Sequence, residues 1–234
     1  MSQWDQLTDI FGCTWNDDTI PAAAADNICI AWPSILACID KAFPNPARLH
    51  ALDFGCGGGL FCRRLFDLGF EVTGYDESAE LIKIARANTP PDVTITNSRT
   101  TVARQGKYDV ITAIMVFQFI DDIESTLRNL VSLLTPSGLI LYAVFNPDFI
   151  NENAGTRFSR PTHSRTWHLE LKDGIQIPFF LRPASEYQHS FARMGFKEVY
   201  VDFPAFTDEF LKKYQVPFST KHSEFLIQAF RRVA

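Results

Sequence analysis

The spacing of hydrophobic residues along this chain changes in a regular way between residues 49 and 145. Short, nearly uninterrupted apolar runs, typical of strands buried on both faces, alternate with segments whose apolar residues recur every three or four positions, as on one face of a helix. This alternation predicts a parallel sheet with helices on both faces. The predicted strands are 49–54, 70–75, 93–96, 108–117 and 139–145, and the predicted helices are 60–68, 79–87 and about 123–134.

The segments on either side follow other patterns. An apolar stripe that starts at Pro33 predicts a helix within an N-terminal helical cap over residues 1–48. Residues 168–181 alternate around Asp173-Gly174, a dipeptide typical of a tight hairpin turn. The last predicted elements are a helix over 184–194 and strands over 196–203 and 224–230.

These patterns predict one α/β domain over residues 49–234, with the hairpin inserted at about 147–182. The net charge of −5 and the lack of a Lys/Arg run argue against nucleic-acid or anionic-lipid binding. The N-terminus lacks the basic segment of a secretory signal, and the longest apolar run is too short to span a membrane. Five cysteines without a close pair argue against a disulfide framework or a metal site. We expect a cytoplasmic monomer or homodimer.

The clearest chemical signal is a glycine-rich turn, Gly55-Cys56-Gly57-Gly58-Gly59, between a predicted strand and a predicted helix. Glycines let a ligand approach the backbone, and a helix N-terminus offers free N–H groups, although a purely structural tight turn has the same composition. Asp53 precedes the turn, and Asp76 follows the next strand, where it is placed either to accept ribose hydroxyls or to cap a helix. The dinucleotide pattern G-x-G-x-x-G requires glycine at the position of Leu60. Two carboxylates suit a positively charged nucleoside better than a dinucleotide.

With these residues the chain resembles the class I S-adenosylmethionine-dependent methyltransferases. Asp53-x-Gly55-x-Gly57-x-Gly59 is similar to their first motif, and Gly74-Tyr75-Asp76-Glu77-Ser78 to their second. The segments 108–111 and 134–138 resemble the start of their fourth strand and the turn before their fifth. The resemblance implies a doubly wound, Rossmann-like seven-stranded sheet of order 3-2-1-4-5-7-6 with the last strand antiparallel.

The resemblance also implies S-adenosylmethionine as the cofactor. Asn97 stands where the family usually has an Asp that accepts the adenine amino group, and its amide oxygen can accept the same bond. Glu77 replaces a residue that is often apolar, and its stem can cover the adenine ring. Met115 either contacts the cofactor through its backbone carbonyl or packs in the core. The implied cofactor-binding residues are Asp53, Gly55, Cys56, Gly57, Asp76, Glu77, Asn97, Ser98 and Met115.

The overall pattern is most similar to the small-molecule branch of the family, of the quinone-biosynthesis type. We predict that Trp15, Gln118, Trp167 and Phe180 line the acceptor site. The chain has 21 phenylalanines, many outside the cofactor-binding units, so we expect a small apolar or aromatic acceptor. Arg157, Arg160 and Arg165 either bind an anionic acceptor or form a solvated face.

No catalytic residue is assigned, because in-line methyl transfer depends mainly on positioning and a general base is optional. His163, His168 and His189 are candidates for such a base, but they lack a sequence partner and fit ordinary surface histidines equally well. Two other function classes compete with methyl transfer. One is a module that binds S-adenosylmethionine or S-adenosylhomocysteine without transferring a methyl group. The other, a nicotinamide oxidoreductase, is disfavoured by Leu60 and by the antiparallel C-terminal edge.

Overall fold

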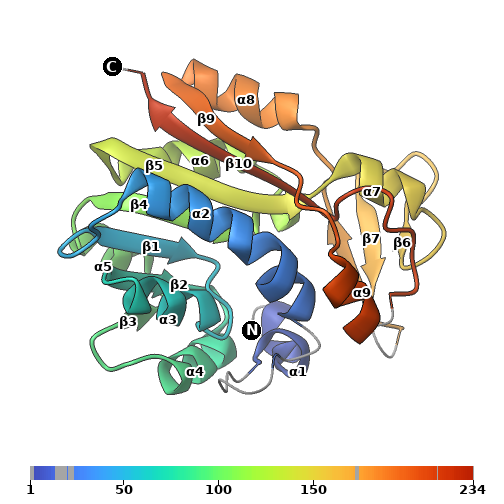
Figure 1. Cartoon of the computed structure of the whole chain (residues 1–234), viewed down its shortest axis with the longest axis horizontal. Helices are drawn as coiled ribbons and strands as arrows, with labels where there is room; N and C mark the ends of the chain where they lie inside the picture. Colours follow the sequence, from blue (N-terminus) through green and yellow to red (C-terminus); the bar gives the residue numbers. More distant parts are fainter. Residues whose placement is uncertain (1–2, 14–19, 21–23, 172–173, 215, 234) are drawn as a thin grey trace.

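A computed structural model describes residues 3–13, 20, 24–171, 174–214 and 216–233. Its main sheet has seven strands in the order β3-β2-β1-β4-β5-β10-β9 (Figure 1). The first five strands pair in parallel, and β10 runs antiparallel to both of its neighbours. The predicted doubly wound order and the antiparallel last strand are therefore confirmed. The strands are β1 His50–Phe54, β2 Glu71–Tyr75, β3 Thr94–Thr96, β4 Tyr108–Ile114, β5 Leu134–Phe145, β9 Phe196–Asp202 and β10 Phe225–Arg232.

Helices cover both faces of this sheet and form two separate hydrophobic clusters with it. One cluster joins the sheet to α2, α3 and α4, and the other joins it to α5, α6 and α8. The central strand β4 contributes Val110 to the first cluster and Ile111 to the second, as alternation along a strand buried on both faces requires. The helices are α2 Trp32–Ala42, α3 Leu60–Asp67, α4 Ala79–Asn88, α5 Arg99–Arg104, α6 Ile123–Ser132 and α8 Ala184–Arg193.

The start of β5 differs from the sequence prediction. A strand was expected from residue 139, after a turn at Pro136-Ser137-Gly138, but β5 already begins at Leu134. The pairing with β4 shifts register between Tyr108 and Val110, so the extra residues are absorbed in an irregular stretch of strand. A side chain at Gly138 would lie 3.0 Å from the Tyr108 carbonyl oxygen, so this register needs glycine there. Short helices α5 and α9, Asp208–Lys213, were also not predicted.

The predicted insertion forms its own small sheet beside the carboxyl end of β5 (Figure 1). The expected hairpin is present as β7 and β8, and a two-residue strand, β6, adds to it. Phe145, Phe149, Phe158 and Phe179 pack together beneath this sheet in a third hydrophobic cluster. The elements are α7 Pro147–Glu152, β6 Phe158–Ser159, β7 Trp167–Glu170 and β8 Gln176–Phe179.

The N-terminal segment also lies at the carboxyl ends of the sheet strands, across from the inserted sheet. It contains η1 Gln3–Gln6, α1 Thr8–Phe11 and η3 Asn27–Ala31, which runs directly into α2. Ser78 Oγ, at the start of α4, donates to Asp5 Oδ1 at 2.6 Å. Asn88 Nδ2, at the end of α4, donates to the carbonyls of Cys13 and Gly58 and so ties the N-terminal segment to the glycine turn. The carboxyl ends of the strands are thus enclosed from two sides. Within the described ranges, no helix has both the length and the apolar character needed to cross a membrane.

Candidate functional site

The glycine turn after β1 adopts a backbone conformation that other residues rarely reach. Gly55, Gly57 and Gly59 have φ angles of +78°, +51° and +81°. The amides of Gly55 and Cys56 both donate to the Tyr75 carbonyl, at 2.7 and 2.9 Å, which fixes the turn against β2. Gly59 then caps α3 in the left-handed conformation, and a Cβ there would meet the Ala85 backbone of α4 at 3.0 Å. The turn is therefore held in one shape before any ligand binds.

Asp76, at the end of β2, is fastened to this turn. Its Oδ2 accepts from the Gly57 amide at 2.9 Å, and its Oδ1 accepts from the Ser78 amide at 2.9 Å. The side chain is buried, and this burial raises the pKa of Asp76 above its usual value. Each carboxylate oxygen still has a free lone pair for a ligand hydroxyl. Ser78 caps α4 by accepting from the Leu81 amide.

Asp53, at the end of β1, lies in a drier environment. It is 2% exposed, and its carboxylate accepts from Thr112 Oγ1 at 2.8 Å and from Cys62 Sγ at 3.5 Å. Burial raises the pKa of Asp53 to about 6, and the nearby Asp76 adds to this rise. A carboxylate kept desolvated in this way favours a positively charged ligand.

The elevated pKa of Asp53 predicts a pH-dependent gain in stability for Asp53→Asn in the ligand-free protein. Between pH 4 and about 6 the folded state holds a proton that the unfolded state has lost, so the stability contributed by this group falls as pH rises through that window. We expect the variant to be about 2 kcal/mol more stable than the parent at pH 7.5, and this gain to shrink as pH falls to 4.5. Urea unfolding at both pH values measures it. A gain of equal size at both values, or the same pattern in the exposed control Asp67→Asn, would contradict this explanation.

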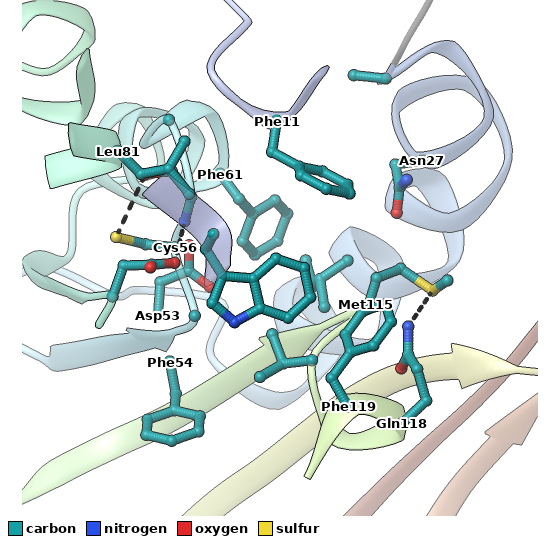
Figure 2. Close-up of a pocket in the computed structure, with 18 of the residues that line it drawn as sticks. Phe11, Asn27, Asp53, Phe54, Cys56, Phe61, Leu81, Met115, Gln118 and Phe119 are labelled. Carbon is teal, nitrogen blue, oxygen red and sulfur yellow. Dashed lines mark hydrogen bonds between the residues drawn. The ribbon is translucent and has the colours of Figure 1, made fainter. Parts of the chain in front are cut away.

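Both aspartates line one cavity of about 570 Å³ at the carboxyl ends of β1, β2 and β4 (Figure 2). Figure 2 shows Asp53 and Cys56 at one side of the cavity and Asn27, Met115 and Gln118 at the other. The space between them is bordered mainly by aromatic rings from distant parts of the chain. These rings are Trp4, Phe11, Trp32, Phe61, Phe119, Phe145, Phe158 and Phe218.

Most of the predicted cofactor-binding residues line this cavity. They are Asp53, Gly55, Cys56, Gly57, Asp76, Glu77 and Met115. Met115 has a φ of +56°, unusual for a residue with a side chain, and this turns the chain away from β4 at the cavity wall. Asn97 and Ser98 lie outside the lining: Asn97 is exposed, and Ser98 Oγ caps α5 by accepting from the Thr101 amide. Arg99, from the same segment, reaches the cavity instead.

Of the predicted acceptor-site residues, only some line the cavity. Gln118 lines the cavity and is 1% exposed. Trp167 lies outside the lining, in the cluster beneath the inserted sheet, where its ring packs near Phe179. Phe180 also lies outside it, since its ring faces the Arg182 guanidinium at 4.8 Å. Trp15 falls outside the residues that the structure describes.

Arg182 has a supporting role next to the site. Its buried guanidinium donates to the carbonyls of Phe117, Ile120 and Asp121, which fixes the short helix η4, Phe117–Phe119. The Phe180 amide donates to the Gln118 carbonyl at 2.7 Å, so β8 and η4 are held together. These bonds set the position from which Gln118 faces the cavity.

Several cavity residues were not assigned to the site from sequence. Asp26 and Asn27 come from the start of η3, and Glu224 comes from the residue before β10. Arg157, which sequence left open as anion binder or solvated residue, also lines the cavity. No local pattern marks these residues, because the segments that carry them meet only after the chain has folded. The candidate base histidines 163, 168 and 189 do not belong to the described lining.

Comparison with known proteins identifies relatives of this chain. A family model described as a methyltransferase domain matches residues 33–201, which is more than half of the chain. The ubiquinone biosynthesis O-methyltransferase of Xanthomonas axonopodis pv. citri (strain 306) is 32% identical over 108 residues, covering 44% of this chain and 45% of that protein. The corresponding protein of Chelativorans sp. (strain BNC1) is 35% identical over 103 residues, covering 42% and 41%. These matches thus span less than half the length of the curated relatives.

Solved structures match over a larger share of the chain. An S-adenosylmethionine-dependent methyltransferase from Mesorhizobium loti has a TM-score of 0.64 at 21% identity, covering 86% of this chain and 97% of that one. A putative enzyme of the same kind from Listeria monocytogenes has a TM-score of 0.68 at 17% identity, with 88% and 100% coverage. Magnesium protoporphyrin IX methyltransferase from Synechocystis PCC 6803 with bound S-adenosylmethionine has a TM-score of 0.60 at 16% identity, with 98% and 91% coverage. At these identities the likeness establishes the fold.

Proposed function

Because the chain belongs to the methyltransferase domain family, we propose that it transfers a methyl group from S-adenosylmethionine to a small-molecule acceptor. The observation that carries this proposal is the fixed position of Asp76 between the Gly57 and Ser78 amides, at the edge of a cavity that continues past Met115 to aromatic walls. An acid at the end of the second strand is suited to bind ribose hydroxyls. The rest of the cavity offers room for a second reactant.

The residues around the turn fit the charges and shape of this cofactor. Asp53 and Asp76 supply two desolvated carboxylates to a ligand that carries a sulfonium and an ammonium. Gly55 and Gly57 line the cavity without a Cβ, so a ligand can lie directly against the backbone. Leu81 and Phe54 border the same part of the cavity and offer apolar contact to an adenine ring.

In this proposal the protein positions the two reactants and excludes water from them. The cofactor supplies a methyl group that its sulfonium already activates. Asp76 and the glycine turn hold one reactant, and η4 and Met115 form the wall that directs the other toward it. Holding two reactants in line is worth on the order of 7–11 kcal/mol, so the chain needs no strong base. The aromatic rings around the cavity exclude water and favour an acceptor with an apolar or aromatic body.

Methyl transfer distinguishes this proposal from a module that only binds the cofactor. We expect purified protein to move a radiolabelled methyl group from S-adenosylmethionine to at least one member of a panel of phenols, quinols, amines and carboxylates. Asp76→Ala is expected to abolish this transfer. Tight binding of S-adenosylhomocysteine without transfer to any acceptor would favour the binding module, and a response to NAD alone would contradict both.

A further inference from the structure

The wall of the cavity opposite the glycine turn carries polar residues, and three of their oxygen atoms lack hydrogen-bond partners among the described residues. We name Asp26, Asn27, Gln118 and Glu224 the acceptor-end cluster; all four line the cavity. Glu224 Oε2, Gln118 Oε1 and Asn27 Oδ1 are buried, and none of them has a hydrogen-bond partner within the described part of the chain. All three atoms are hydrogen-bond acceptors, and leaving a buried acceptor unpaired costs about 1–3 kcal/mol. A ligand that donates hydrogen bonds would satisfy them.

The fold fixes these oxygens in place. Glu224 is 7% exposed, and its carbonyl accepts from the Asn146 amide at 2.8 Å, which places it at the carboxyl end of β5. Asn27 Nδ2 donates to Asp26 Oδ1, so the amide oxygen of Asn27 is the atom left for a ligand. Gln118 Nε2 is directed at Met115 Sδ at 3.7 Å, so the buried amide oxygen of Gln118 is the atom left for a ligand (Figure 2).

Two carboxyl groups come close together at this wall. Asp26 and Glu224 lie close enough to repel one another, and burial together with this repulsion raises the pKa of Glu224 well above its usual range. Arg157 attracts both carboxyls, but its side chain is exposed, so it offsets their repulsion only in part. A bound cation with several N–H donors would relieve this repulsion and offer hydrogen bonds to the unpartnered oxygens.

From this arrangement we propose that the acceptor is an amine with an apolar body, which binds the acceptor-end cluster as its ammonium ion. A carboxylate of the cluster takes one N–H proton, and the neutral nitrogen then accepts the methyl group while the sulfonium sulfur leaves as a thioether. The apolar body of the amine lies against apolar residues that line the same cavity and belong to, or pack against, the cluster beneath the inserted sheet. They are Phe145, Phe158, Leu169, Leu171 and Phe218. This inference rests on the proposed function for the identity of the second reactant, and it extends that function by naming the acceptor's chemical class.

The test compares three probes that share a phenol ring and differ in one end group. Tyramine carries an ammonium, para-ethylphenol carries no charge, and para-hydroxyphenylpropionate carries a carboxylate. Binding of each is measured by calorimetry on protein saturated with S-adenosylhomocysteine. We expect tyramine to bind roughly 10- to 100-fold more tightly than the other two. Equal affinities, preference for the carboxylate, or no binding of tyramine would overturn the proposal.

Three variants test which residues cause the preference for tyramine. Glu224→Gln keeps the shape of the side chain and is expected to reduce tyramine affinity by roughly tenfold while leaving para-ethylphenol unchanged. Asp26→Asn is expected to act in the same direction and provides an independent check if Glu224→Gln folds poorly. Arg157→Ala removes the competing cation and is expected to increase tyramine affinity by roughly two- to fivefold. Equal losses for all three probes in both acidic variants would contradict an ammonium site.

The same titrations show whether a negative result contradicts the amine site alone or the proposed function as well. Failure of the parent protein to bind S-adenosylhomocysteine would contradict the methyltransferase assignment itself. Normal binding of S-adenosylhomocysteine without a preference for tyramine would contradict only the amine site.

Discussion

Replacing Asp76 with alanine is expected to weaken S-adenosylhomocysteine binding by roughly 100-fold, because the proposed complex would lose two hydrogen bonds from ribose hydroxyls to this carboxylate. The same change frees the Gly57 amide, which Asp76 Oδ2 holds at 2.9 Å, so the glycine turn also loses its fixed shape. Isothermal calorimetry on the parent and the variant measures the effect.

Two further variants show whether the loss is specific to this carboxylate. Asp76→Asn keeps one oxygen and is expected to fall between the parent and the alanine variant. Asp92→Ala removes an exposed acid outside the cavity lining and is expected to bind like the parent. Parental affinity in Asp76→Ala, with the fold intact by circular dichroism, would show that this acid does not hold the cofactor.

Replacing Gly59 with alanine is expected to destabilise the protein by about 3 kcal/mol or more, since two costs add at this position. Its φ of +81° is unfavourable for any residue with a Cβ, and the new Cβ would lie 2.9–3.1 Å from three atoms of Ala85 on α4. Two of those atoms belong to the backbone, so α4 would have to move. Urea unfolding measures the loss.

Gly155→Ala provides a matched control for the backbone cost alone. Gly155 has a φ of +87°, and a Cβ there would meet nothing within 4 Å. We expect this variant to lose only about 1–2 kcal/mol. Equal losses at both positions would show that close packing of α4 against the glycine turn contributes nothing, and that φ alone explains the need for glycine.

The parts of the fold that were predictable from sequence are those in which one segment carries its own signal. The apolar run of β4 and the three- and four-residue spacing of α6 each define an element locally, and their alternation predicts a parallel sheet with helices on both faces. The glycine turn and Asp76 were predictable for a similar reason. Each follows a parallel strand, and the carboxyl ends of parallel strands meet at one edge of the sheet. The strand order followed from the resemblance to the methyltransferase family. The three-residue strand β3 and the two-residue strand β6 lie near the limit of what such patterns resolve.

The residues on the acceptor side of the cavity were less predictable than the glycine turn, because they come together only through tertiary contacts. Glu224 looks like an ordinary polar residue before a strand, yet pairing of β10 with β5 buries it at the cavity. Trp167 and Phe180 have the size and polarity expected of pocket residues, but the inserted sheet directs one into its own core and the other toward Arg182. Asn97 follows β3 as expected, but the cap of α5 turns the chain there and leaves it exposed.

A crystal structure of the complex with S-adenosylhomocysteine tests the central claim most directly. The claim predicts that both ribose hydroxyls lie about 3 Å from the Asp76 carboxylate. It also predicts that the sulfur lies near Met115 and faces the space bordered by Gln118 and Glu224. A ligand bound in the opposite orientation, with its adenine against Asp26 and Glu224, or bound outside this cavity, would contradict the account.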